Sequence, residues 1–328
     1  MTHGAFILGP EGSGITEWER GFFREADPWG FILFARNVDT HDQLRRLTGS
    51  LRDAVGREAL ILIDQEGGRV QRLRPPHWQE WLPPFDQAGQ ARDAVRSFWL
   101  RYRLIAAELR AVGIDGNCAP TCDIASQSTH PFLRNRCLGE TPDTVTALAR
   151  ASADGMLAGG VLPVIKHMPG HGRGMVDSHL NLPVADVPAS EARRWDFAPF
   201  RGLCDLPLGM SAHIVYPDFD SAPATQSRVM VDLIRRDIGF DGLLMTDDIS
   251  MEALSDSLAE RARLSLAAGC DVVLHCNGKA AEMQTIAEAS GRLSAAALAR
   301  AGAALTLRRD PEPADLAEMA RELTALLA

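Results

Sequence analysis

The sequence has no run of 18 apolar residues, no surplus of basic residues, and no basic segment followed by a long apolar one at its start. Without such an apolar run, no helix is expected to span a membrane. Lys and Arg number 34 against 43 Asp and Glu, for a net charge of −9. This balance disfavours nucleic acid and anionic membranes as partners. The start of the chain does not resemble a secretory signal peptide, so we expect a soluble, cytoplasmic protein.

A zinc-finger pattern is also missing. Cys118 and Cys122 are the one closely spaced cysteine pair, and no second pair stands at the spacing that a structural zinc site requires. The six cysteines, several of them within apolar runs, are predicted to be reduced thiols rather than disulfides or metal ligands. We therefore expect no metal and no cofactor.

What the chain does contain is a regular alternation of short apolar runs and amphipathic stretches. Most of the runs are continuously apolar, which is typical of strands buried on both faces of a parallel sheet. There are eight such runs: Gly4–Leu8, Phe31–Phe34, Leu60–Asp64, Ile114–Ala119, Leu162–Lys166, Leu208–Ala212, Gly242–Thr246 and Asp271–His275. Eight strand–helix units favour an α/β fold of the single (β/α)8 TIM-barrel type over a doubly wound sheet, which remains the alternative.

Helix signals lie between the runs. Thr40 begins a capping-box pattern, and Thr141-Pro142 combines a cap with proline in the first turn. The segments Ala91–Val112 and Val229–Ile238 have helical periodicity, and Pro311–Ala328 is predicted to be one further helix. No linker or low-complexity segment interrupts the 328 residues, so one catalytic domain over residues 1–328 is expected.

In a barrel of this kind the active site lies at the carboxyl ends of the strands. The polar residues that follow the eight runs are therefore the candidates for a site. They are Asp64 to Arg72, Arg136, Lys166 to His179, His213, Asp247 with Asp248, and Asn277. Their convergence on one rim would suit a ligand with many hydroxyl groups.

The loop after the fifth run has the highest density of reactive side chains. Residues 166–179 include three histidines, and its glycines and Pro169 exclude a helix there. Within it, Asp177-Ser178-His179 is a candidate dyad, because a carboxylate beside an imidazole makes a general acid/base. A glycine-rich loop can also move to close over a substrate.

Two acidic segments follow other strands. Asp247, at the end of the seventh run, is the better candidate for a nucleophile, whereas Asp248 could equally cap a helix. After the third run, residues 64–72 carry carboxylates and guanidinium groups that suit hydrogen bonding to sugar hydroxyls. Within that segment we expect Glu66 and Arg69 to pair with each other.

Several of these segments together resemble glycoside hydrolase family 3, and most closely its bacterial β-N-acetylglucosaminidases of peptidoglycan recycling. The resemblance extends over nearly the whole chain, in the same order. The matching segments are Lys166-His167-Met168-Pro169-Gly170-His171-Gly172, Asp177-Ser178-His179, Met245 to Met251, Ile63 to Arg72, and Gly209 to Pro217. Met168 stands where phenylalanine is usual, which alters packing rather than chemistry.

The resemblance implies a retaining exo-hydrolase that removes terminal N-acetylglucosamine from muropeptides. Asp247 would match the nucleophile that forms a covalent glycosyl intermediate, and His179, held by Asp177, would match the acid/base. The residues that would match the sugar-binding set are Asp64, Arg72, Arg136, Lys166 and His167. The segment after Arg136 departs from the usual pattern. The single-domain members of the family end after the barrel, as this chain does.

Other functions remain open at this stage. A β-glucosidase of the same family would differ in the substituent at the second carbon of the sugar, and a phosphorylase would use phosphate in place of water. A metal-dependent hydrolase would use His167, His171, His179 and Asp247 as ligands, although Lys166 and Arg173 would crowd a cation. A sugar-binding protein without catalysis is disfavoured, because candidates for nucleophile and acid/base are both present.

Overall fold

The computed structural model describes residues 2–174 and 181–328. Within them, eight parallel strands close into a barrel in the order β1-β10-β9-β8-β7-β6-β3-β2. These strands are β1 (Gly4–Leu8), β2 (Pro28–Leu33), β3 (Leu60–Ile63), β6 (Gly116–Asn117), β7 (Leu162–Met168), β8 (Leu208–Ser211), β9 (Leu243–Asp248) and β10 (Val272–His275). The predicted (β/α)8 barrel is confirmed, and the doubly wound alternative is wrong because the sheet has no open edge.

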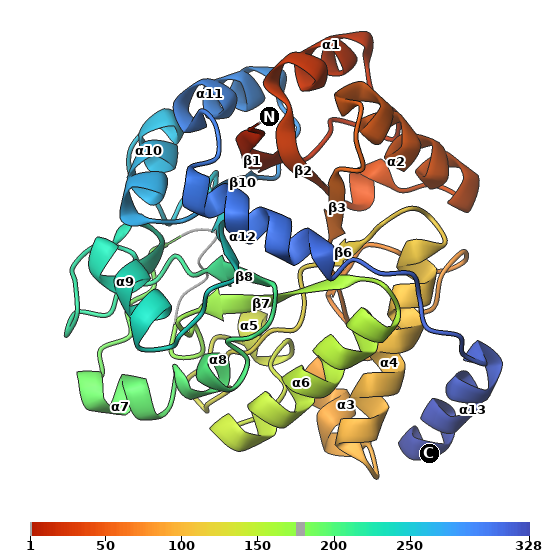
Figure 1. Cartoon of the computed structure of the whole chain (residues 1–328). Coiled ribbons are helices and arrows are strands. Elements are labelled where there is room, and N and C mark those ends of the chain that lie inside the picture. Colours follow the sequence, from red (N-terminus) through yellow and green to blue (C-terminus); the bar gives the residue numbers. More distant parts are fainter. Residues whose placement is uncertain (1, 175–180) are drawn as a thin grey trace.

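Helices surround the barrel (Figure 1). They are α1 (Glu17–Ala26), α2 (His41–Val55), α3 (Pro84–Gln90), α4 (Ala94–Arg110), α5 (Pro131–Arg134), α6 (Pro142–Ala158), α7 (Ala189–Arg194), α8 (Ala198–Gly202), α9 (Arg228–Arg236), α10 (Leu258–Ala268), α11 (Ala280–Ser290), α12 (Ala295–Thr306) and α13 (Leu316–Leu327). The side chains of Thr40 and Thr141 cap α2 and α6 as predicted. The last helix begins at Leu316 rather than at Pro311, and it packs on α4. None of the described helices is long and apolar enough to cross a membrane.

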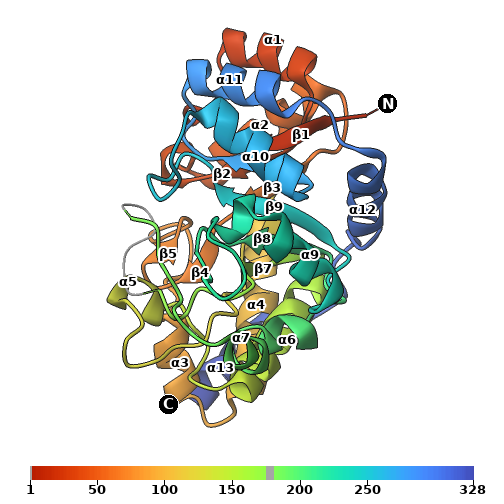
Figure 2. The same ribbon diagram turned by 90° about the vertical axis from the view of Figure 1, so that its left-hand side faces the viewer.

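The apolar interior of the barrel is closed at its amino-terminal end by α12. Ala297, Ala301 and Ala304 form one face of this helix and belong to the same buried cluster as Ile7 and Leu62 from the barrel interior. Figure 2 shows α12 on the side of the barrel opposite to α5 and the short strands β4 (Gln65–Gly67) and β5 (Val70–Gln71). The carboxyl ends of the strands are therefore the end at which a ligand can enter.

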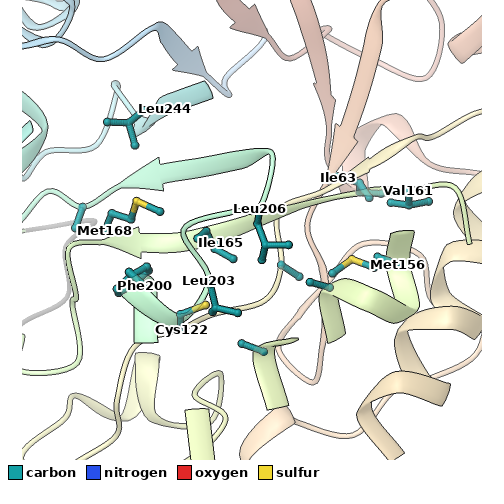
Figure 3. Packing of buried hydrophobic residues seen from close by; sticks show 14 of the residues in the cluster. Ile63, Cys122, Met156, Val161, Ile165, Met168, Phe200, Leu203, Leu206 and Leu244 are labelled. Carbon is teal, nitrogen blue, oxygen red and sulfur yellow. The ribbon is translucent and has the colours of Figure 1, made fainter. Parts of the chain in front are cut away.

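The outward-facing side chains of β7 form part of the layer between barrel and helices. Ile165 and Met168 are fully buried there, and Figure 3 shows them near Phe200 of α8 and Leu203. Each such buried apolar side chain contributes about 1.5–3 kcal/mol to folding. The side chain of Met168 thus packs in the layer between barrel and helices, in agreement with the prediction that methionine in place of phenylalanine alters packing rather than chemistry.

Candidate active site

Strand periodicity carries three charged side chains to the open end of the barrel. On β3, β7 and β9, every second side chain points into the barrel interior. Along each strand, the first two of these inward-facing residues are apolar, and the third, at the carboxyl end, is charged. These triplets are Leu60-Leu62-Asp64, Leu162-Val164-Lys166 and Leu243-Met245-Asp247, in each of which the two apolar residues belong to the interior cluster. Asp64, Lys166 and Asp247 thereby line one cavity.

This cavity has a volume of about 230 Å³. Six of the residues predicted for the site line it, namely Asp64, Arg72, Arg136, Lys166, His167 and Asp247. Apolar side chains, among them Phe34, Phe132 and Met210, complete its wall. A cavity with fixed charges at one side and apolar surface at another suits a sugar ring, which has hydroxyls at its edge and C–H groups on its faces.

Asp64 bonds to two cationic side chains, those of Arg72 and Lys166. Its Oδ2 accepts a hydrogen bond from Arg72 at 2.8 Å, and its Oδ1 accepts one from the Nζ of Lys166 at 3.1 Å. Burial alone would raise the pKa of Asp64, but the charges of Lys166 and Arg72 outweigh burial and hold the pKa well below its usual range. Asp64 is therefore ionised and its position is fixed before any ligand enters.

Glu66 does not pair with Arg69, so that prediction is wrong. Glu66 receives two hydrogen bonds from Arg136, at 2.8 and 2.9 Å, and its Oε1 lies 2.6 Å from the Nζ of Lys166. The guanidinium of Arg69 instead stacks on the ring of Phe132, with its carbon 3.7 Å from the ring centre. Glu66 is buried, and sequence spacing gave no indication that it would face the barrel rather than the nearer arginine.

The backbone at Glu66 is set by a buried arginine on α4. Arg101 donates hydrogen bonds to the carbonyl oxygens of Glu66 and Leu82. Gly67 has φ +107°, and a Cβ at that position would lie 1.8 Å from the Nη2 of Arg101. Only glycine fits beside this arginine, which explains the Gly-Gly turn between β4 and β5.

The buried charges of this network stabilise one another. Burial opposes ionisation of Glu66, but Arg136 and Lys166 lower its pKa to about 2. Burial likewise opposes the charge of Lys166, but Glu66 and Asp64 raise the pKa of its ammonium group above the usual value. At neutral pH the cavity wall therefore carries paired, fully ionised groups of both signs.

Asp247 ends β9 with its side chain 21% exposed toward the cavity. Its Oδ1 accepts the backbone N–H of Asp248 at 2.8 Å, and its Oδ2 lies 3.9 Å from the Nε2 of His167. Burial would raise the pKa of Asp247, but His167 and His213 outweigh it and lower the pKa. An ionised, partly accessible carboxylate at this position has the properties of a nucleophile.

Asp123 is a residue of the site that sequence reasoning missed. Its fully buried carboxylate accepts the Nδ1 proton of His167 at 2.7 Å and the backbone N–H of His171 at 2.6 Å. It thereby orients His167 so that Nε2 faces Asp247 and lies 3.4 Å from Arg136. The signal available in the sequence is an acidic residue shortly after the fourth apolar run, Ile114–Ala119.

Asp123→Asn should lower kcat/KM by about 10–100-fold, because an amide no longer fixes the tautomer and orientation of His167. Steady-state kinetics with an aryl N-acetylglucosaminide measures the loss. One-dimensional ¹H NMR gives a second readout, since a low-field imidazole N–H signal that depends on His167 should disappear in the variant. An unchanged kcat/KM would show that Asp123 has no positioning role.

Asp248 has a local structural task, but it is not a helix cap. Its carboxylate accepts hydrogen bonds from the backbone N–H and the hydroxyl of Ser250, at 3.1 and 2.8 Å, and from the N–H of Cys276 at 3.3 Å. The next helix, α10, begins only at Leu258 with Ser257 as its cap. Asp248 stabilises the turn after β9 and connects it to β10.

Asp177 and His179 lie outside the described residues. The segment that leads toward them is held at several points. The hydroxyl of Tyr216 donates to the carbonyl of Gly170 at 2.8 Å, and that of Thr129 donates to the carbonyl of Gly172 at 2.6 Å. Arg173 pairs with Asp196 at 2.9 Å and Glu191 at 2.7 Å. Burial raises the pKa of Asp196 to about 6 against the lowering effect of Arg173.

No metal cluster is evident in the described part of the chain. Among residues 2–174 and 181–328, no three His, Cys, Asp or Glu side chains gather closely enough to hold an ion. All six cysteines are free thiols and five of them are buried, which confirms the prediction of reduced thiols. Within these residues, neither histidines nor cysteines support the metal-dependent alternative.

Comparisons with known proteins show which family the chain is similar to. The model of the glycosyl hydrolase family 3 N-terminal domain matches residues 27–305. A β-hexosaminidase from Bordetella avium and one from Chromobacterium violaceum are each 38% identical to the chain over 84% of it, covering 81% and 80% of the relatives. The crystal structure of NagZ from Neisseria gonorrhoeae in complex with N-trifluoroacetyl-D-glucosamine has a TM-score of 0.89 at 30% identity, with 100% of this chain and 99% of that chain covered.

Proposed function

The chain belongs to glycosyl hydrolase family 3, as a glycoside hydrolase of the β-hexosaminidase type, and from this premise we propose a specific reaction. The enzyme removes terminal, non-reducing N-acetylglucosamine from peptidoglycan fragments, the muropeptides. It acts with retention of configuration through a covalent intermediate on Asp247. The relatives named β-hexosaminidase do not favour the glucosidase or phosphorylase alternatives.

The observation that carries this proposal is the environment of Asp247. Its carboxylate is ionised, reaches the cavity, and is held by the N–H of Asp248 on one oxygen while the other faces His167. In a retaining glycosidase the nucleophilic carboxylate attacks the anomeric carbon as the leaving oxygen departs. Asp247 would form that bond, and water would later break it.

Proton transfer is assigned to His179, oriented by Asp177. In the first step the imidazolium would protonate the leaving oxygen, and in the second step the neutral ring would take a proton from the attacking water. The proposal rests on the Asp-Ser-His pattern and its place in the chain. It is supported by the stem of the loop, where Gly170, Gly172 and Arg173 are each tied to neighbouring elements.

The remaining site residues are assigned to binding of the sugar. Asp64 offers acceptor oxygens, while Lys166 and Arg136 present fixed donors beside it. Arg72 also lines the cavity, and its guanidinium is held in place by its hydrogen bond to Asp64. His167 completes this set with a ring that Asp123 holds in place. Charge-assisted hydrogen bonds of this kind bind hydroxyls in defined directions.

Substrate class, location and domain organisation belong to the same proposal. The amino-terminal end of the barrel is filled with side chains, so the cavity is closed at its inner end, which suits removal of one terminal sugar.

The free state of all six thiols supports a reducing compartment, the cytoplasm. We assign residues 1–328 to a single catalytic domain, supported by the packing of α13 on α4. A sugar-containing small molecule is the expected partner, with neither nucleic acid nor a membrane.

The test compares aryl β-N-acetylglucosaminide and aryl β-glucoside as substrates and follows the released sugar by ¹H NMR. We expect the N-acetylglucosaminide to be the better substrate, with the β-anomer formed first and no sugar 1-phosphate when phosphate is added. Early α-anomer would contradict retention. A better glucoside would contradict the substrate, and a phosphorylated product would contradict hydrolysis.

His179→Ala should lower kcat/KM, which reports the first step, by about 10²–10⁴-fold for a substrate with a poor leaving group, because general-acid assistance is lost. The loss should be smaller for a nitrophenyl glycoside, whose leaving group needs little protonation. Parallel kinetics with the two leaving groups measures this difference. Equal losses for both would contradict the assignment of proton transfer to His179.

A further inference from the structure

His171 lines the same cavity and has no task in the reaction described above. It follows β7, and its backbone N–H is fixed by the carboxylate of Asp123 at 2.6 Å. The residue is 7% exposed, and its ring stands edge-on to that of His167, with ring centres 5.8 Å apart. The side chain is thus held against the wall of the site, beside the histidine that faces Asp247.

Both ring nitrogens of His171 are buried and have no hydrogen-bond partner among the residues that the structure describes. Two other histidines at this end of the barrel use their ring nitrogens within the protein. His167 uses Nδ1 for Asp123, and His213 uses Nδ1 for Thr225 and Nε2 for the carbonyl of Asp248. A buried polar group without a partner destabilises a protein, so such groups are rare and call for a ligand or an ordered water.

Both the ring and the neighbouring Gly174 belong to the lining of the cavity. Gly174 also lines the cavity, and a Cβ at that position would lie 3.0 Å from the Cε1 and 3.1 Å from the Nδ1 of His171. These distances are shorter than an ordinary van der Waals contact of a Cβ atom. A side chain at position 174 would press on this edge of the imidazole, so glycine keeps the ring in its place at the cavity wall.

The charge state of the ring determines what it can bind. Burial lowers the pKa of His171 to about 4, with Asp123 and Asp247 acting in the opposite direction and His167 in the same one. At neutral pH the ring is therefore uncharged and offers one N–H donor and one acceptor nitrogen. Amide and hydroxyl groups offer the same combination, whereas a carboxylate can only accept and an ammonium group can only donate.

We propose that His171 is a substrate-contacting residue that hydrogen-bonds an uncharged polar group of the sugar, either the acetamido group or a ring hydroxyl. This inference rests on the proposed function, since it assumes that the cavity around Asp247 holds the sugar. It adds a specificity-determining residue to the binding set. Because the ring has no hydrogen-bond partner in the described part of the chain, its hydrogen bonds would contribute to binding of the sugar and not to folding.

The experiment replaces the ring by one of similar size without nitrogens. His171→Phe should lower kcat/KM for an aryl N-acetylglucosaminide by about 10-fold or more, the effect of one buried hydrogen bond. Its melting temperature should be unchanged or higher, since no hydrogen bond within the described structure is lost. His171→Asn and His171→Gln place an amide near the former Nδ1 or Nε2, and one of them should restore part of kcat/KM.

The aryl β-glucoside identifies the group that is bound. A loss for the N-acetylglucosaminide alone assigns the contact to the acetamido group, and an equal loss for both substrates assigns it to a hydroxyl. Wild-type rates in His171→Phe would overturn the proposal. So would a fall in melting temperature in all three variants, with activity restored in none of them. If the wild-type enzyme turned over neither substrate, the proposed function would fail instead.

Discussion

Asp247→Ala should reduce kcat for an aryl N-acetylglucosaminide by at least about 10⁴-fold, the scale seen when a catalytic nucleophile is removed. Without the carboxylate, no oxygen is in position to form the bond to the anomeric carbon. Among residues 2–174 and 181–328, the side chain accepts a single hydrogen bond, from the N–H of Asp248. Thermal unfolding should therefore change little, and the loss should appear in steady-state kinetics alone.

Asp248→Asn is the matched control for this variant. The neighbouring carboxylate holds Ser250 and the N–H of Cys276, and an amide oxygen can still accept most of those hydrogen bonds. We expect a loss below about 10-fold, the effect of weakening a single hydrogen bond. Equal losses of kcat in the two variants would mean that Asp247 and Asp248 share the role of nucleophile. A loss of kcat below about 10-fold in Asp247→Ala would show that Asp247 is not the nucleophile.

Glu66→Ala should destabilise the protein by about 3–5 kcal/mol, because it leaves Arg136 and Lys166 as buried charges without their shared partner. The same change should raise KM, since both cations belong to the proposed sugar-binding set. Chemical denaturation measures the free energy of unfolding. Glu80→Ala is the control, because Glu80 pairs with Arg74 at the surface, with 51% of its side chain exposed, and should cost at most about 1 kcal/mol.

The contribution of Glu66 should also depend on pH. Its pKa is about 2 in the folded protein against 4.5 for the free group. A carboxylate with a lowered pKa stabilises the fold above its unfolded pKa and loses this effect as the pH falls through its folded pKa. The stability difference between wild type and Glu66→Gln should therefore shrink between about pH 4.5 and pH 2. A difference that stays constant over this window would contradict the buried ion pairs.

The sequence predicted the barrel because its signal is local. Continuous apolar runs such as Leu60–Ile63 and Leu162–Ile165 indicate strands buried on both faces, whatever the rest of the chain does. The fourth run was less well predicted. Six residues from Ile114 to Ala119 read as a strand, but only Gly116–Asn117 form β6. Beyond Asn117 the chain still runs beside β7, with the N–H of Val164 bonded to the carbonyl of Ala119 and an isolated bridge between Thr121 and Lys166, but it no longer forms a regular strand. Apolar composition carries no information about where regular pairing stops.

The polar network could be predicted only in part. Strand ends identify Asp64, Lys166 and Asp247, because period-2 alternation fixes the direction of a side chain at a strand end. The partner of Glu66 could not be found in this way. Its pairing with Arg136, 70 residues away, depends on how Arg101 turns the β4–β5 hairpin toward the barrel. The position of Asp123 beside His167 depends likewise on the path of the chain after β6.

The central claim is that Asp247 forms a covalent bond to the sugar, and mass spectrometry of the trapped enzyme tests it most directly. Wild-type enzyme is quenched in acid during turnover of an aryl N-acetylglucosaminide, then cleaved after arginine to give the peptide of residues 237–261, which contains both Asp247 and Asp248. We predict that this peptide gains the mass of one N-acetylglucosaminyl group and that fragmentation locates it on Asp247. An adduct on Asp248 or on another peptide, or turnover to the α-anomer without an adduct, would contradict the account.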